Sequence, residues 1–383
     1  MLCQKDHFSI PDHVTYLNCA YMSPQLKTVM DAGIEAAHIK NYPFQIKAED
    51  FFNATTLLRQ TFSKLIGNPD PDRIAVIPSV SYGMAIVSKN LNLQAGEEIL
   101  LTHEQFPSNF YPWQKLACEK KGRLVIVEAP NEDDRGKKWN EKILENINEK
   151  TKLVTIGNVH WADGTKFDLK AIRQRTSEVG ALLVVDGTQS VGALPFDVGD
   201  IQPDALVCSG YKWLLGPYSM AFAYFGSFFD DGDPIEENWI NRHNSEDFAG
   251  LVAYESNYKE KALRYAVGEH SNFSLTPMMQ KALEQLNEWG ASNIQQYCSQ
   301  LTKAPIAELL SLGFRIENEN YRGSHLIGIR VPDHLDVKAL SNQFKKHDVY
   351  ISVRGNAIRV APHVYNDQND MDKLVEIIKK AAL

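Results

Sequence analysis

Residues 208–217 read CSGYKWLLGP and set one cation, Lys212, inside apolar sequence. The run before it, residues 205–208, has the composition of a buried strand, and Trp213 and two leucines follow. A lone lysine after a strand is usually a surface residue whose aliphatic stem packs on its neighbours. The meaning of Lys212 therefore depends on which other side chains fall at strand ends.

Short apolar runs bounded by turn residues alternate with segments of helical period from about residue 50 to residue 225. This alternation is typical of βα units, which build a mostly parallel sheet covered by helices. The sequence thus predicts an α/β fold with a mostly parallel seven-stranded sheet between helices. The expected strands are residues 74–77, 98–101, 124–127, 153–156, 182–185, 205–208 and 220–224.

The remaining sequence predicts a smaller second domain. Residues 226–260 lose the periodicity and read as a long irregular connection, a kind of loop that usually serves function or an interface. From Thr276 a long helical pattern leads into a strand, a charged helix near 335–347, two strands and a last helix. We expect a large α/β domain at 15–260 and a small α+β domain at 276–383, with residues 1–14 as a candidate addition to the small one.

The composition narrows the class of function. The 383 residues carry 40 basic and 48 acidic side chains, a net charge of −8, with no basic run that would suggest a nucleic-acid or membrane surface. Five scattered cysteines without a Cys-x-x-Cys pair or a His/Cys cluster argue against a disulfide framework and a metal site. No signal-peptide pattern or membrane span is recognisable, so we expect a cytoplasmic protein.

Charged and polar residues follow several of the expected strands. In a βα fold ligands bind beyond the carboxyl ends of strands, and Asp186 and Lys212 both occupy such ends. Asp186 after four apolar residues reads as a buried acid, although a helix cap is an alternative. A buried lysine beside a buried aspartate suits pyridoxal 5′-phosphate (PLP): the amine forms a Schiff base, and the carboxylate keeps the pyridine nitrogen protonated.

The segment 184–217, VVDGTQSVGALPFDVGDIQPDALVCSGYKWLLGP, strongly resembles fold-type I PLP enzymes of the class V aminotransferase group. That group includes cysteine desulfurases, kynureninases and isopenicillin-N epimerase-like proteins. The resemblance runs from YLNCAYMSP (16–24) to RVAPHVYND (359–367), and Lys212 follows Asp186 by 26 residues as in such families. It implies the fold-type I architecture, an amino acid substrate and PLP as cofactor.

The resemblance assigns roles around the lysine. Lys212 is the Schiff-base lysine and Asp186 the partner of the pyridine nitrogen. Gln189 matches the residue that hydrogen-bonds the phenolic oxygen of the cofactor, with a polar residue at a helix start as the alternative. Ser209 and Tyr211 match phosphate contacts, although Tyr211 could simply pack. Desulfurases usually have histidine at the Tyr211 position, and kynureninases have tyrosine.

Two more segments match the cofactor site. PSVSYGMAIV (78–87) places Val80 and Ser81 at the start of a helix, where free backbone N–H groups favour an anion, and it matches the phosphate loop of the family. HEQFPSNFYPWQ (103–114) matches the segment that stacks on the cofactor ring, which makes Phe106 the stacking residue. Core packing is the alternative for this aromatic side chain.

Substrate contacts are implied by two segments. In NVHWADGTKFDL (158–169), Asn158 matches a residue that contacts substrate or the ring oxygen, and His160 either faces the pocket as an acid/base or supports it. In ISVRGNAIRVAPHVYN (351–366), Arg359 is expected to hold the α-carboxylate, since a guanidinium can bind a carboxylate with two parallel hydrogen bonds. Arg354 is the alternative residue for binding this carboxylate.

A dimer is also implied. RYAVGEHSNFS (264–274) corresponds to a segment that, in the family, reaches the phosphate bound by the other chain. Ser271 and Asn272 are the candidates, with His270 less firmly placed. The resemblance therefore implies a homodimer with its site at the interface.

Several reactions are compatible with this set of residues. Residues 353–358 contain no cysteine to accept sulfur, which argues against a desulfurase. An aminotransferase needs Lys212 as proton carrier and is the reaction we expect. Epimerase, β-lyase or kynureninase-like chemistry, with Tyr21, His160 or Tyr211 as a second acid/base, is the alternative. A PLP-binding protein without catalysis fits poorly with an intact Lys212 and Asp186, and the amino substrate and acceptor stay open.

Overall fold

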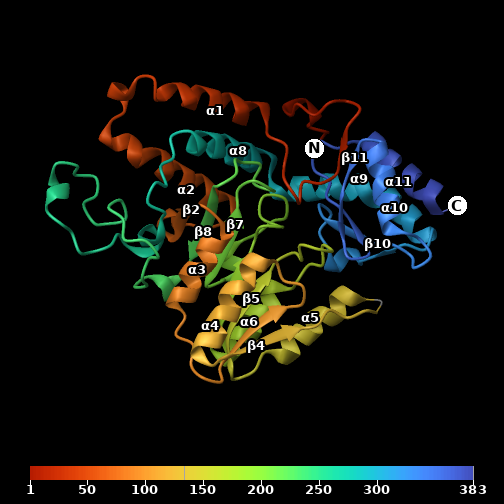
Figure 1. The fold of residues 1–383 in the computed structure, drawn as a ribbon, viewed down its shortest axis with the longest axis horizontal. Coiled ribbons are helices and arrows are strands. Elements are labelled where there is room, and N and C mark those ends of the chain that lie inside the picture. Colours follow the sequence, from red (N-terminus) through yellow and green to blue (C-terminus); the bar gives the residue numbers. More distant parts are fainter. Residues whose placement is uncertain (133, 383) are drawn as a thin grey trace.

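A seven-stranded sheet forms the centre of the computed structural model, which describes residues 1–132 and 134–382 (Figure 1). Strand β8 is antiparallel to both of its neighbours, β2 and β7, and every other pair is parallel. The predicted α/β fold with a mostly parallel sheet is confirmed. In spatial order the strands are β2 (Ile74–Ile77), β8 (Ala221–Phe225), β7 (Ala205–Ser209), β6 (Leu182–Asp186), β5 (Thr151–Gly157), β3 (Glu98–Thr102) and β4 (Arg123–Val127).

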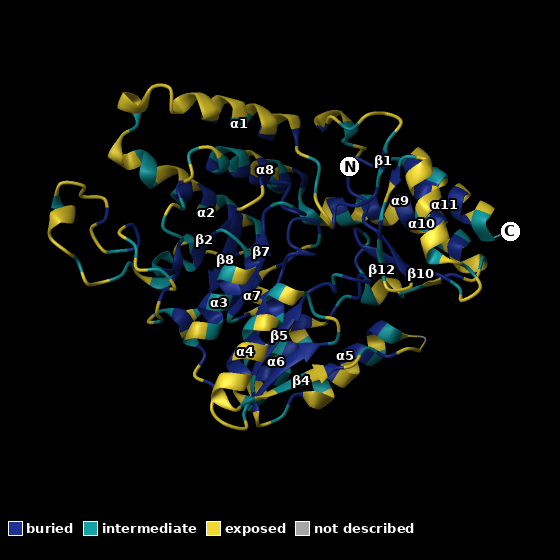
Figure 2. Ribbon diagram, in the orientation of Figure 1, coloured by how far each residue is buried: buried dark blue, intermediate teal, exposed yellow. Residues whose placement is uncertain are grey.

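Both faces of this sheet are buried, as its apolar strands require. Successive residues of a strand point to opposite faces, so Leu183 and Leu206 join one apolar cluster while Val184 and Val207 join another. Most strands are dark in the burial view, whereas the edge strand β4 is partly exposed and helix α1 on the outside is largely exposed (Figure 2). The helices of this region are α1 (Lys27–Ile39), α2 (Asn53–Leu65), α3 (Val80–Asn90), α4 (Tyr111–Lys120), α5 (Arg135–Asn146), α6 (Leu169–Val179), α7 (Val198–Ile201) and α8 (Leu275–Trp289).

A second, antiparallel sheet lies in the C-terminal part of the chain, with a third apolar cluster of its own. Its order is β12 (Ser352–Arg354), β13 (Ala357–Val360), β10 (Ile327–Arg330) and β9 (Arg315–Ile316), and β9 is not expected from the sequence. The accompanying helices are α9 (Ala291–Ser311), α10 (Val337–Lys346) and α11 (Gln368–Ala382).

The N-terminal residues pack with this C-terminal part. Strand β1 (Thr15–Tyr16) pairs in parallel with β11 (Val349–Tyr350), and Leu17 belongs to the C-terminal apolar cluster. The chain thus crosses to the large sheet only after residue 17. The domain limits given above stay a prediction, and this pairing argues for moving the first of them past residue 15.

The sequence predicts one long helix after Thr276, whereas the structure has two helices in this region. In the structure α8 ends at Trp289 and α9 begins at Ala291, with Gly290 between them at φ +74°. This left-handed conformation costs glycine little and other residues more, so the chain turns there. The expected irregular segment 226–260 contains only short 3₁₀ turns and extends away from the large sheet (Figure 1). No helix in the described ranges is long and apolar enough to span a membrane.

Candidate active site

A cavity of about 420 Å³ opens beyond the carboxyl ends of β6 and β7. It lies where a βα fold is expected to bind a ligand. Most of the residues predicted for a cofactor site line this one cavity: Val80, Ser81, Phe106, Asp186, Gln189, Ser209, Tyr211 and Lys212.

Lys212 is held in the return from β7 to the antiparallel β8. The Gly210 amide donates to the Met220 carbonyl at 2.8 Å, and the Leu215 amide donates to the Lys212 carbonyl at 3.0 Å. A Cβ on Gly210 would lie 2.7 Å from the Met220 carbonyl oxygen, so only glycine fits this crossing. The return is therefore a tight closed loop that fixes the lysine backbone.

The Lys212 side chain is buried and faces two aromatic rings. It is 7% exposed, and its Nζ lies 5.4 Å from the centroids of both the Phe106 and the Tyr211 rings. Burial lowers the pKa of Lys212 to about 8, against the opposing attraction of Asp186. A sizeable fraction of the amine is thus neutral, and therefore nucleophilic, near neutral pH.

Uptake of PLP by the cofactor-free protein is expected to accelerate about tenfold between pH 7 and pH 9 and then to level off. The neutral Lys212 amine is the form that attacks the aldehyde of PLP, and the pKa of this amine is about 8. The rate of appearance of the visible absorbance band measures this. An ordinary lysine would give a rise of about a hundredfold without a plateau, which would contradict the lowered pKa.

Asp186 ends β6 and is 8% exposed. Its Oδ1 accepts a hydrogen bond from the Thr188 amide at 3.0 Å and so caps the turn that follows the strand; no helix begins at these described residues, unlike in the helix-cap alternative considered above. Burial raises the pKa of Asp186, while the Thr188 hydrogen bonds and the Lys212 charge oppose the rise. A buried carboxylate with this surrounding is stabilised by a cationic ligand group such as a protonated pyridine nitrogen.

Another part of the cavity lining suits a phosphate. Ser209 Oγ is buried without a hydrogen-bond partner, and the start of α3 at Val80 opens on the same space. Ser79 Oγ caps this helix by accepting from the Tyr82 amide at 3.2 Å and lies 2.9 Å from Ser81 Oγ. An orphaned hydroxyl beside a helix N-terminus is the donor set that a phosphate needs. Because Phe106 and Lys212 line the same cavity, the residues present fit PLP.

Of four further predicted residues, one lines this cavity with most of its side-chain hydrogen bonds already made, and three do not line it. Gln189 lines it, but its Nε2 donates to the Ala20 carbonyl and its Oε1 accepts from Trp213, so one amide hydrogen is left for a ligand. Asn158 is buried next to Asp186 without lining the cavity. Ser271 and Asn272 line a different cavity, of about 660 Å³ beside α1, so within one chain they do not meet Lys212.

Trp161 is a site residue that the sequence analysis missed. Its ring lines the cavity and meets the Phe106 ring edge-on at 5.4 Å, and its carbonyl accepts from Arg359 Nη1 at 2.7 Å. Arg359 is 1% exposed on β13, and burial lowers its pKa to about 9. The signal was present in the sequence, because Trp161 follows His160 in the segment already matched to the site.

His160 does not line the cavity, which corrects its assignment as a substrate contact. The ring is 2% exposed and packs on Trp139 at 5.0 Å. Its Nδ1 lies 3.0 Å from Asp163 Oδ1 and its Nε2 lies 3.2 Å from the His103 carbonyl oxygen. Both ring nitrogens are therefore engaged within the protein. Of the two alternatives given for His160, these contacts agree with support of the pocket.

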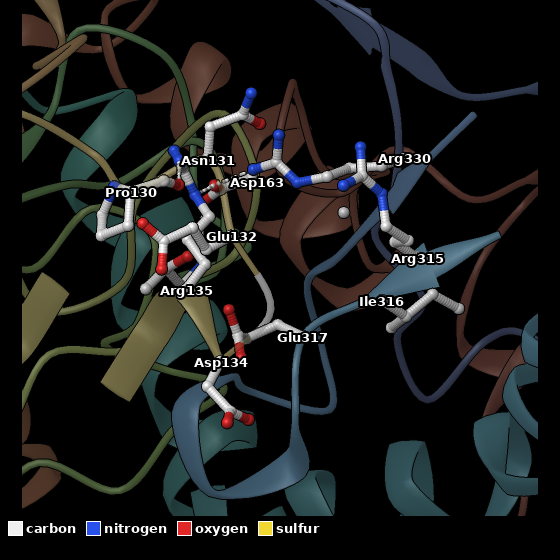
Figure 3. Close-up of a pocket in the computed structure, with 12 residues that line it drawn as sticks. Pro130, Asn131, Glu132, Asp134, Arg135, Asp163, Arg315, Ile316, Glu317 and Arg330 are labelled. Atoms are coloured by element: carbon white, nitrogen blue, oxygen red, sulfur yellow. Dashed lines mark hydrogen bonds and ion pairs between the residues drawn. The ribbon is translucent and has the colours of Figure 1, made fainter. Parts of the chain in front are cut away.

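Asp163 connects His160 to two arginines from other elements; Figure 3 shows Asp163 with these arginines. Its Oδ2 accepts from Arg135 of α5 at 3.1 Å and from Arg330 of β10 at 2.8 Å, and its Oδ1 also accepts from the Thr165 amide. Burial acts to raise its pKa, but His160 and the two guanidinium groups outweigh burial and hold the pKa below its usual range. Asp163 thus joins the turn that carries Trp161 to the C-terminal sheet.

The variant Asp163→Asn is expected to lose about 3 kcal/mol of unfolding free energy, because an amide NH₂ would face two buried guanidinium groups that then lack a counter-charge. Urea denaturation measures the loss. Asp168→Asn is the matched control, since Asp168 only caps α6, a place where asparagine serves as well. Equal stability of both variants would contradict the role of Asp163.

Comparisons with known proteins agree with this site. A family model described as aminotransferase class V matches residues 23–374. The chain is 28% identical to an uncharacterized aminotransferase, YcbU, of Bacillus subtilis (strain 168) over 325 residues, which cover 85% of this chain and 83% of that protein.

Two solved structures share the fold. An apo cysteine desulfurase from Thermococcus onnurineus NA1 has a TM-score of 0.83 at 19% identity, covering 99% of this chain and 98% of that one. The cystine C–S lyase C-DES, in a variant with glycine covalently linked to its PLP cofactor, has a TM-score of 0.85 at 20% identity, covering 99% of both chains. At 19% and 20% identity, the similarity to these solved structures shows the fold of this chain. The match to the family model shows the family to which the chain belongs. The chain belongs to the class V aminotransferase family of PLP-dependent enzymes.

Proposed function

We propose that this protein is an aminotransferase that acts on an amino acid through Lys212. The observation that carries the proposal is the buried Lys212 amine, with a pKa lowered to about 8, in one cavity with Asp186 and Phe106. When bound there, PLP supplies an electron sink that weakens the bonds around the α-carbon of an amino acid. The protein then selects the reaction by orienting the substrate and placing protons.

The residues divide this work. Lys212 would hold PLP, and its amine, the basic group inside the cavity, would move a proton at the α-carbon of the substrate. Asp186 would keep the pyridine nitrogen charged, and Phe106 would pack against the ring. Arg359 binds the α-carboxylate, supported by its bond to the Trp161 carbonyl and by its Nε, which has no partner.

The other reactions are less well supported. Among the described residues no cysteine lines the cavity: Cys19, Cys208 and Cys298 are buried elsewhere, Cys118 lies on α4, and Cys3 is exposed near the N-terminus. This argues against a desulfurase. Epimerisation needs a second acid/base. The engaged His160 and the solvent-exposed Tyr21 do not line the cavity, whereas Tyr211 does. Epimerisation through Tyr211 and lyase chemistry of the β-lyase or kynureninase-like type therefore stay as alternatives.

A homodimer in the cytoplasm is part of the proposal. Ser271 and Asn272 line a cavity together with Phe51 and Trp239, and exposed aromatic side chains such as Phe44 and Tyr254 occur in the same half of the chain. A partner that covered this region would bring Ser271 and Asn272 toward a second active site, and light scattering tests the assembly. The five free cysteines agree with a reducing compartment.

Product analysis tests the reaction. The protein loaded with PLP is mixed with single amino acids in the absence of an acceptor, and products are identified after one turnover. One equivalent of keto acid, with the amine form of the cofactor left on the protein, is the result expected of an aminotransferase. Release of ammonia together with a side-chain fragment would indicate a lyase, and inversion of the amino acid an epimerase.

A further inference from the structure

Two arginines flank the same cavity residue. Arg354 ends β12 and Arg359 lies on the adjacent strand β13, where Ser352 pairs with Arg359. The Arg359 guanidinium donates to the Trp161 carbonyl at 2.7 Å, and the Arg354 guanidinium lies 5.2 Å from the centroid of the Trp161 ring. Trp161 itself lines the cavity that contains Lys212. Neither arginine is itself part of the cavity lining, so the hairpin of β12 and β13 places two cations beside the cavity wall at Trp161.

Neither cation has a carboxylate partner in the part of the chain that the structure describes. Arg359 bonds to the Trp161 carbonyl and to Ser352 Oγ, and Arg354 bonds through Nη1 to the Val353 carbonyl at 2.8 Å. Arg354 Nε and Nη2 are thus available to a ligand. Arg135 and Arg330, by contrast, both meet the carboxylate of Asp163.

The charges near the cavity are consequently out of balance. Arg354 and Arg359 each act to lower the pKa of Lys212, and Arg354 acts in the same direction on Arg359 after the larger effect of burial. Asp186 is the one carboxylate that lines the cavity, and PLP would engage it through the pyridine nitrogen. Three cations that share one carboxylate repel one another, and a bound anion relieves this repulsion.

The two guanidinium groups differ in burial and in partners, since Arg359 is 1% exposed and bonded to Trp161 and Ser352, whereas Arg354 is only half-buried and bonds to the Val353 carbonyl alone. The α-carboxylate of an amino acid occupies Arg359, the more deeply buried of the two, and the second cation remains. We propose that Arg354 binds an acidic group on the side chain of the substrate, so that the enzyme prefers amino acids with a side-chain carboxylate or sulfinate. This inference rests on the proposed function, because it names the substrate class of the same site. The Trp161 ring, by shielding one face of the Arg354 guanidinium from water, strengthens its attraction for such a group.

Matched substrate pairs test the proposal. The PLP-loaded protein is mixed with glutamate or glutamine, and with aspartate or asparagine, and the rate of the cofactor spectral change is measured at rising concentrations. Each pair differs only in the side-chain charge. The acid is expected to react with a specificity constant about 10- to 100-fold above that of its amide, which is the usual worth of a charged hydrogen bond. A wild-type preference for the amides would overturn the proposal.

Variants assign the preference to Arg354. Arg354→Gln is expected to reduce the acid-to-amide ratio by about 10- to 100-fold, and Arg354→Lys to retain part of it. Arg315→Gln removes an exposed arginine on β9 that lies outside this cavity, and its ratio should equal that of the wild type. An unchanged ratio in Arg354→Gln would overturn the assignment.

Failure of this inference is distinguishable from failure of the proposed function. If neutral amino acids react as fast as acidic ones and yield keto acids, the aminotransferase stands and Arg354 has no role in selection. If the folded protein shows the cofactor band and no amino acid of either class changes it, the proposed function fails as well. Retention of the cofactor band in the Arg354 variants shows that they are folded.

Discussion

The variant Lys212→Ala is expected to lose covalent attachment of PLP and about 10⁴-fold or more of the turnover rate. Two contributions disappear together: the amine that bonds to the cofactor and the base that moves a proton at the substrate. The cavity should survive, since the Lys212 backbone is held by the return from β7 to β8 and the removed side chain leaves space that PLP can fill. Mass spectrometry after borohydride reduction measures attachment, and product formation measures turnover.

Two controls accompany this variant. Lys212→Arg keeps a cation in the cavity but offers no amine of suitable pKa, so it should be as inactive as the alanine variant. Lys170→Ala removes a lysine that is 65% exposed on α6 and should behave as the wild type. A Lys212→Ala protein that still carried PLP covalently, at another lysine, with normal turnover would refute the assignment of Lys212.

The variant Asp186→Asn is expected to lose about 10³-fold in turnover while keeping its fold. Asparagine retains the oxygen that accepts from the Thr188 amide at 3.0 Å, so the strand end keeps its local structure. What is lost is the negative charge opposite the pyridine nitrogen, and removal of one preorganised electrostatic partner costs about 10²- to 10³-fold in comparable sites. The dissociation constant for PLP should rise as well.

Spectra distinguish a chemical role of Asp186 from a structural one. The pH dependence of the visible band of bound PLP should shift in Asp186→Asn, because the protonation of the ring changes. The exposed Asp200, changed to asparagine in the same way, should leave the band as it is. Normal turnover with an unaltered band in Asp186→Asn would show that the carboxylate serves only as a cap.

The fold and the centre of the site were predictable because local sequence carries their signals. Apolar runs such as residues 182–185 can only be strands buried on both faces, and they fixed the sheet. Asp186 and Lys212 stand directly at strand ends, and parallel neighbours bring such ends together. Hydrophobic periodicity does not show where a helix ends, so it predicted one helix where the structure has α8 and α9. The separation at Gly290 depends on its left-handed backbone, which only the structure shows.

The supporting residues could not be predicted because their partners lie far away in the sequence. His160 looked like a proton carrier, and only Asp163 and the His103 carbonyl, which occupy its two nitrogens, show otherwise. Trp161 received no attention because aromatic residues usually fill cores. Its contact with Arg359, 198 residues later, exists only in the folded chain.

The closed return between β7 and β8 also determines where the chain can change in length. An extra residue between Gly210 and Met220 would break the crossing of these two residues and displace the lysine from the ring of Phe106. The irregular segment 226–260 has no such crossing with the wall of the Lys212 cavity, so insertions and deletions there would leave the position of Lys212 unchanged. Divergence among related enzymes is therefore expected to accumulate as loop-length variation after β8, while the lysine loop stays of constant length.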